Sequence, residues 1–150
     1  MPFTDKYDLE EISYGVSGWN GILTTDLQIL DDVIHTRYES TVGEAVAAYT
    51  TVEIRSDGKV YNSLTTLSGT DYVPIGIMIE AGVLDETKRA QISGLIVNNS
   101  WSWTPGDRLY THRTVSGTLT DTLTVTGTNT QHYIGVAVTS SGILLQIQGA

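Results

Sequence analysis

The sequence predicts a mainly β protein that begins with a single α-helix. Apolar residues recur at helical spacing over residues 19–38, and after about residue 50 the spacing changes to alternate residues. Glycine and Ser-Gly dipeptides punctuate this second region, as they do between short strands. We therefore expect an N-terminal attachment segment, residues 1–48, and a β-rich head, residues 50–150, built as a small antiparallel sandwich or barrel.

The helix predicted over residues 19–38 carries a wide apolar stripe. Residues at steps of three and four lie on one face of a helix, and such a face needs a partner. Two partners remain open: the strands of the same chain, or further copies of the helix in a trimer. The stripe is shorter than the roughly three to four heptads that identify a coiled coil. Its residues are Trp19, Ile22, Leu23, Leu27, Leu30 and Ile34.

The head divides into short strand-like segments separated by turn signals. Ser56-Asp57-Gly58 separates TTVEIR from KVYNSL and predicts a hairpin. Pro74 lies within YVPIGIMIEAG, so this strand begins there, lies at an edge or carries a bulge. VLDETKRA, residues 83–90, could form a helical turn but is better explained as a polar loop. The other predicted strands are QISGLIVN, DRLYTH, GTLT, HYIGVAV and GILLQIQ.

Composition limits the partners and the chemistry. The chain has no cysteine, which excludes disulfides and thiolate chemistry. Its net charge is −9, and without a cluster of Lys and Arg we expect no nucleic-acid partner. The acidic residues 1–50 either contact another protein or form a solvated face. The first ten residues include acids, and no stretch reaches about 20 apolar residues, so we expect neither a secretory signal nor membrane insertion.

The sequence contains no motif for catalysis or metal binding. His35, His112 and His132 are isolated and belong to no HExxH or HxH pattern, so a metal site would need one of them near a trimer axis. Asp31 and Asp32 are adjacent, and on a helix their side chains diverge by about 100°. Neither a phosphate-binding loop nor a GxSxG motif is present. We expect no enzymatic activity, no cofactor and no metal.

The segment WSWTPGDRLY contains the candidate ligand contacts Trp101, Trp103 and Tyr110. In a strand the two tryptophans would face the same side, and Tyr110 could join them across the Pro105-Gly106 turn. If exposed, these rings would suit a sugar-binding surface. If packed, they would contribute to the core or to a subunit contact. The residues alone leave both interpretations open.

Two stretches resemble structural proteins of bacteriophages. YGVSGWNGILTTDLQILDDVIHTRYES resembles the N-terminal segment of short tail fibre and baseplate-associated proteins, where aromatic-Gly, Gly-Trp-Asn and Leu-Asp-Asp precede a helix. IVNNSWSWTPGDRLYTHRTVSGTLTDTLTVTGTNTQHYIGVAVTSSGILLQI resembles the small β module of tail fibres and other virion surface proteins, and VPIGIMIE would open the same module. Asp107-Arg108 and TVTGTNTQH depart from the family pattern. The matching positions are Trp103–Gly106, Leu109–Tyr110, Gly117–Thr120, Ile134–Ala137 and Ile143–Leu145.

The resemblance implies a homotrimer on the virion, at the tail or baseplate. The N-terminal helix would trimerise and bind other virion proteins, and the β head would face outward toward a host surface glycan or protein. Two alternatives remain: a capsid decoration (cement) protein that uses the same β module, and a carbohydrate-binding module centred on Trp101, Trp103 and Tyr110.

Overall fold

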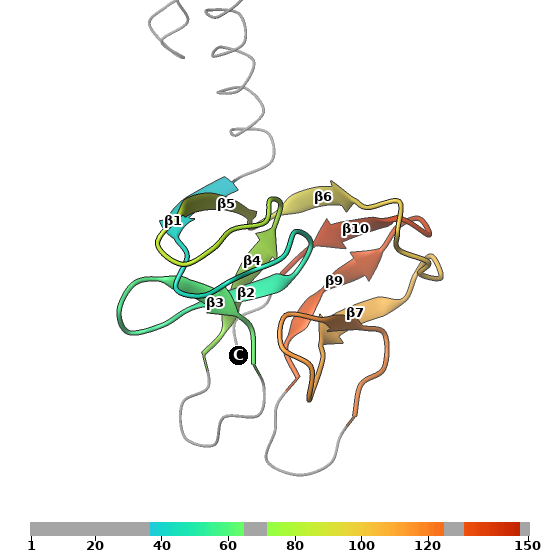
Figure 1. The fold of residues 1–150 in the computed structure, drawn as a ribbon. Helices are drawn as coiled ribbons and strands as arrows, with labels where there is room; N and C mark the ends of the chain where they lie inside the picture. The colour runs from blue at the N-terminus through green and yellow to red at the C-terminus, as the bar shows by residue number, and fades with distance from the viewer. Residues whose placement is uncertain (1–36, 65–71, 125–130, 148–150) are drawn as a thin grey trace, which may run out of the picture. The chain divides into compact units, whose positions relative to one another are not determined.

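The computed structural model describes residues 37–64, 72–124 and 131–147, which form ten β-strands and no helix (Figure 1). The chain divides into two units, Met1–Ile34 and His35–Ala150, and all the described residues belong to the second. The apolar stripe of the predicted helix lies outside the described residues. The predicted end of that helix is wrong, because Arg37 and Tyr38 begin a strand whose backbone pairs with Gln91 and Ala90.

The first five strands form one antiparallel sheet in the order β1-β5-β4-β2-β3. A parallel bridge between Val42 and Val60 joins the end of β1 to β3, so the two edges of this sheet meet. We call the described residues of 37–91 the first module. Its strands are β1 Arg37–Thr41, β2 Thr51–Ile54, β3 Val60–Asn62, β4 Pro74–Met78 and β5 Thr87–Gln91.

The next five strands form a second antiparallel sheet in the order β6-β10-β9-β7-β8. This is the order of the first sheet, with each strand replaced by the one that comes five places later in the chain. We call the described residues of 94–147 the second module. Its strands are β6 Gly94–Val97, β7 Arg108–Thr111, β8 Leu119–Thr120, β9 Tyr133–Ala137 and β10 Gly142–Leu145.

The two modules also share their strand registers. Val52 of β2 lies opposite Gly76, and Leu109 of β7 lies opposite Gly135, with a register shift directly after Val52 and after Leu109. The loops repeat as well, because the amide of Tyr49 donates to Met78 and the amide of Gly106 donates to Ala137. The head is therefore two copies of one fold in tandem, and the mainly β prediction is confirmed as two antiparallel sheets.

The glycines of the two Ile-Gly pairs have the same structural role. A Cβ atom on Gly76 would overlap the carbonyl oxygen of Gln91, and one on Gly135 would overlap that of Leu144. Glycine lets the neighbouring backbone approach this closely. VPIGIMIE was expected to open the same module as HYIGVAV, but the structure places it in β4 of the first sheet, at the position that β9 has in the second.

Each module has its own hydrophobic core. Burial of these apolar side chains contributes about 25 cal/mol per Å² of surface removed from water. The first core consists of Val42, Val46, Val52, Val60, Met78 and Ala90. The second core consists of Ile96, Leu109, Leu119, Ile134, Ala137, Ile143 and Leu145, joined by Ile77 from the first sheet.

Four further predictions of strand limits can be compared with the structure. The Ser56-Asp57-Gly58 hairpin is confirmed, with Gly58 at φ +78°. β4 begins at Pro74, next to the register shift in β2. VLDETKRA was expected to be a loop, but Thr87–Gln91 forms β5, because partners on both sides satisfy its backbone. QISGLIVN belongs to two strands rather than one, since Ile92 and Ser93 separate β5 from β6, which begins at Gly94 with φ +87°.

The structure also moves the start of the head. β1 pairs along its whole length with β5, so residues 37–48, expected to be part of the attachment segment, belong to the β fold. Val42 and Val46 of this stretch are buried in the first core. The boundary was predicted too late because the charged and small residues around Val42 and Val46 hide the strand pattern.

The hairpin between β7 and β8 connects the two modules. Gly117 lies between two backbones of the first module: its carbonyl accepts from Thr51 at 2.8 Å, and its amide donates to Ser63 at 2.9 Å. A second connection lies near the chain crossover, where the Gln91 side chain donates to the carbonyl of Leu95 at 3.0 Å. These bonds fix the modules at two separate places.

Candidate functional site

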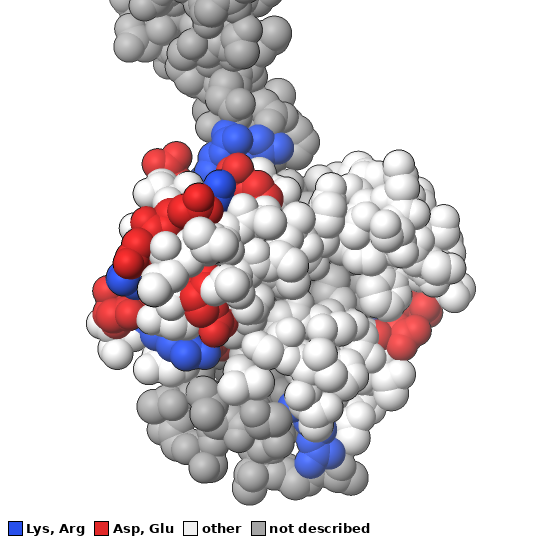
Figure 2. All heavy atoms as spheres, viewed as in Figure 1, with Lys and Arg blue, Asp and Glu red and all other residues white. Residues whose placement is uncertain are grey.

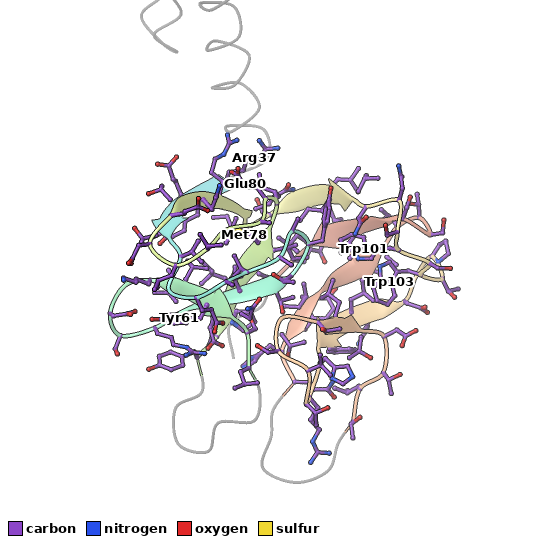
Figure 3. All side chains as sticks on the ribbon, viewed as in Figure 1. Arg37, Tyr61, Met78, Glu80, Trp101 and Trp103 are labelled. Atoms are coloured by element: carbon purple, nitrogen blue, oxygen red, sulfur yellow. The ribbon has the colours of Figure 1, made fainter. Side chains whose placement is uncertain are left out.

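The two tryptophans of the predicted ligand surface lie in the connection between β6 and β7. They were expected in a strand, but Trp101 and Trp103 lie outside the strands, held by bonds from their amides to the carbonyls of Asn98 (3.0 Å) and Ser140 (2.9 Å). Their ring centroids are 6.3 Å apart with the planes inclined at 53° (Figure 3). The Asn98 turn shapes this segment in place of strand pairing.

Trp103 is a core residue of the second module. Its ring packs against the second hydrophobic core, and its indole nitrogen is buried without a hydrogen-bond partner within the described ranges. Val46, which follows β1 as Trp103 follows β6, lies in the first core in the same way. Trp101 also packs against this core, so the packing interpretation applies to both tryptophans, and a substitution at Trp103 would disturb the fold before it tested any ligand.

Trp101 is paired with a tyrosine that the sequence did not single out. The Tyr49 and Trp101 rings meet edge to face, with centroids 5.6 Å apart and planes at 74°. Tyr110, expected beside the tryptophans, instead lies edge to face with Tyr133 on the adjacent strand, at 5.9 Å. Of the predicted ligand contacts, Trp101 therefore remains a candidate, and Tyr49 takes the place of Tyr110. The candidate site lies at the junction of the modules.

A groove lies beside Tyr49 at this junction. Its volume is about 420 Å³, within the range of roughly 300–1,000 Å³ of small-molecule sites. Both modules contribute, and the lining mixes polar and apolar groups: Arg37, Tyr49, Ile79, Gln91, Leu95, Ile96 and Val97. Such a mixture allows apolar contact together with a few oriented hydrogen bonds.

Gln91 is the fixed polar group of this groove. The side chain is only 3% exposed, and its Nε2 donates to the carbonyls of Ser93 (2.9 Å) and Leu95 (3.0 Å). These two bonds hold the amide plane in one orientation. The amide oxygen is then the atom of Gln91 that is left to accept a hydrogen bond.

A second groove, of about 440 Å³, has a different character. It is lined by Tyr38 and otherwise by apolar side chains: Ile54, Pro74, Ile75, Ile92 and Ile147. This lining offers few groups that could orient a ligand, so the groove beside Tyr49 is the better candidate site.

Two carboxylates of the first module with shifted pKa values, Glu53 and Asp57, accept hydrogen bonds from other residues of the same module. Glu53 is 1% exposed, and burial raises its pKa although Leu64 and Arg55 donate to it at 3.2 and 3.1 Å. At the surface, the Tyr61 hydroxyl donates to Asp57 at 2.6 Å, which lowers the pKa of Asp57 and raises that of Tyr61. Each group already has its partner, so none is placed as a general acid or base.

The histidines are structural in the described part of the chain. His112 Nδ1 accepts from the amides of Thr114 (3.2 Å) and Val115 (3.1 Å), closing the β7–β8 turn. His132 is buried at 8% exposure, and its amide donates to Thr111 Oγ1 at 2.9 Å. His35, Asp31 and Asp32 lie outside the described residues. Over residues 37–64, 72–124 and 131–147, no group of three His, Asp or Glu side chains could hold a metal ion.

Charge divides the surface between the modules. On the face drawn in Figure 2, most Lys, Arg, Asp and Glu atoms lie over the first module, and the second is largely uncharged. The described part of the chain contains no helix that is long and apolar enough to cross a membrane. No protein-family model matches the sequence, and comparison with curated proteins gives no match.

Proposed function

We propose that this chain is a structural protein of a bacteriophage particle, a short homotrimeric tail fibre or baseplate-attached protein. The N-terminal segment attaches to other virion proteins and trimerises, and the two β modules face the host surface. In this role the described residues act by binding and assembly rather than by catalysis.

One observation carries the proposal: four of the five family-like motifs of the C-terminal half include strands of the second sheet, and the fifth, Trp103–Gly106, lies in the connection between two of its strands. Gly117–Thr120 includes β8, Ile134–Ala137 lies in β9, and Ile143–Leu145 lies in β10. A resemblance that arose by chance from Thr- and Gly-rich composition would not have to coincide with one structural unit. The agreement therefore supports a module that is used as a whole.

The location is tested by counting copies in purified particles. A tail or baseplate protein is expected in a handful of trimers per particle, and labelled antibody should mark the tail in electron micrographs. A capsid decoration protein, the alternative that would use the same modules, is expected in hundreds of copies distributed over the head. Absence of the chain from purified particles would contradict both.

The assembly is tested by removing residues 1–36, because β1 begins at Arg37. Light scattering should show a trimer for the full chain and a monomer for the truncated one, with the β-type circular dichroism unchanged. A matched pair of single substitutions refines the test: Leu27→Asp should disrupt the trimer because it places a charge in the apolar stripe, whereas Asp31→Asn should leave it intact. A truncated chain that stays trimeric would show that the helix is not the assembly element.

A further inference from the structure

The backbone of Tyr49 has a conformation that tyrosine rarely adopts. Its φ is +64°, in the left-handed region, and the corresponding position of the second module is Gly106 at φ +97°. Asp85 is the other described non-glycine residue with positive φ, at +68°, and Asp tolerates this region better than Tyr does. The first module therefore retains an aromatic ring where the fold favours glycine. Strain of this kind is often found at ligand sites.

The position of the Tyr49 ring gives a reason for this strained backbone. Tyr49 is 36% exposed, lines the groove between the modules, and is held by its edge-to-face contact with Trp101. A ring fixed in this way presents a flat apolar surface at little cost in conformational entropy. The groove thus has a rigid aromatic wall on one side.

Gln91, in the lining of the groove, supplies an oriented acceptor. Gln91 is 3% exposed, and its amide nitrogen donates hydrogen bonds to the carbonyls of Ser93 and Leu95. Within the described ranges no donor is bound to its amide oxygen. This oxygen is not among the side-chain atoms that are buried without a partner in the described residues, so water or a ligand hydroxyl in the groove can reach it.

We propose that this groove is a binding site for a neutral saccharide, with one pyranose ring lying on Tyr49 and one sugar hydroxyl donating to the amide oxygen of Gln91. Apolar contact with a ring face and a hydrogen bond from a hydroxyl are the two interactions that a sugar offers together. Apart from Arg37, every side chain that lines the groove is uncharged. The site is independent of the virion proposal, because a sugar-binding groove would act in the same way in a protein outside a particle.

The test uses the full chain and an array of immobilised neutral glycans, followed by calorimetry with the best soluble one. We expect binding with a dissociation constant of about 1 mM, and a shift of the Trp101 indole N–H resonance on titration. Tyr49→Gly should weaken binding at least about tenfold. Because glycine suits φ +64°, the same variant should keep the fold and lose no thermal stability.

Two controls separate the ring from the backbone. Asp85→Gly relieves a positive φ at a place that is not in the groove lining, so it should leave binding unchanged. Tyr49→Phe keeps the flat ring and should bind within about threefold of the parent chain. Gln91→Met removes the acceptor together with the amide bonds to Ser93 and Leu95, so it should reduce binding, and urea unfolding should show that the variant still unfolds cooperatively.

Three results would overturn the proposal. The first is that no neutral glycan binds the parent chain. The second is that Tyr49→Gly binds as well as the parent chain. The third is that Tyr49→Gly changes the subunit number instead, which would assign the groove to a contact between copies.

Discussion

The first and second modules have the same strand order and registers but differ in the number of charged residues that they carry. Twelve charged residues are described in the first module: Arg37, Glu39, Glu44, Glu53, Arg55, Asp57, Lys59, Glu80, Asp85, Glu86, Lys88 and Arg89. Four are described in the second: Asp107, Arg108, Arg113 and Asp121. The fold therefore does not depend on the ion pairs of the first module. What both copies retain is the glycine at the closest strand contact and the positions of the core.

The cores also show how one backbone accepts two different side-chain sets. In the first module Met78 lies opposite Ala90, and at the same place in the second Ala137 lies opposite Ile143. The large and the small residue have exchanged strands. Volume at the pair is conserved while identity is not, which is the kind of change that protein cores tolerate best.

The largest effect is expected where the modules agree most closely. Gly135→Ala should destabilise the protein by about 3 kcal/mol or more, because the new methyl group would meet the backbone of Leu144 rather than a movable side chain. Gly76→Ala should cost a similar amount at the matching place. Chemical unfolding measures both, with Gly142→Ala as the control, since its methyl would meet the side-chain oxygen of Thr139 at 2.7 Å. A mild effect at Gly135 would show that the strands can separate there.

The next largest loss of stability is expected at the core pairs Met78–Ala90 and Ala137–Ile143. Ile143→Ala should cost about 3 kcal/mol through a cavity in the second core. Met78→Ala should cost about 2 to 3 kcal/mol in the first core. Adding Ala90→Ile to Met78→Ala would copy the pair of the second module, and the double variant should recover to within about 1.5 kcal/mol of the parent chain. If the two changes instead add independently in a double-mutant cycle, the modules are not equivalent at this pair.

The matching hairpin glycines distinguish a strained backbone from a contact between modules. Gly58→Ala should cost about 1 kcal/mol from its φ of +78° alone, because its Cβ would meet open space. Gly117→Ala, at φ +71°, should cost about 1 kcal/mol more, since the methyl would lie 2.7 Å from Asn62 Oδ1 in the first module. If urea unfolding shows that Gly58→Ala and Gly117→Ala lose equal free energy of unfolding, the Asn62 side chain moves aside freely.

The smallest effect concerns the buried carboxylate of the first module, whose counterpart in the second is Tyr110. Burial raises the folded-state pKa of Glu53 above its unfolded value, so the native state favours the protonated form. Its contribution to stability is therefore fully present below the unfolded pKa and is lost as pH rises through the folded pKa. Glu53→Gln should be more stable than the parent chain at neutral pH, and this advantage should shrink on acidification. Urea unfolding at pH 4 and pH 8 measures it, and an advantage that grows toward acid pH would contradict the assignment.

Local patterns were enough to predict much of the head. Turn signals and alternating apolar residues identified the Ser56-Asp57-Gly58 hairpin and the strand that begins at Pro74, because both depend on neighbouring residues. β5 was missed because Thr87, Lys88 and Arg89 do not alternate in hydropathy, and partners on both sides fix this strand.

The repeat and the candidate site could not be predicted in this way. The modules share the Ile-Gly pair, but the exchange of Met78 and Ala90 for Ala137 and Ile143 conceals the common core from a residue-by-residue comparison. The Tyr49 site depends on a contact between residues far apart in the chain and on a positive φ that tyrosine seldom has. WSWTPGDRLY did identify Trp101, one half of the aromatic pair.

The hairpin contact at Gly117 differs from the matching positions at the outer ends of the two modules. At the free end of the first module, the shorter turn uses the Gly58 amide internally, in a 2.9 Å bond to the carbonyl of Arg55. At the free end of the second, Gln131 Nε2 occupies the carbonyl of Thr122 at 3.2 Å, where the first module receives its neighbour. Both outer ends are thus closed by their own side chains or turns. The same two places of the fold therefore bond within a module at the outer ends and across the two modules at the Gly117 hairpin, so one hairpin design serves both as a closed turn and as a clasp between neighbours.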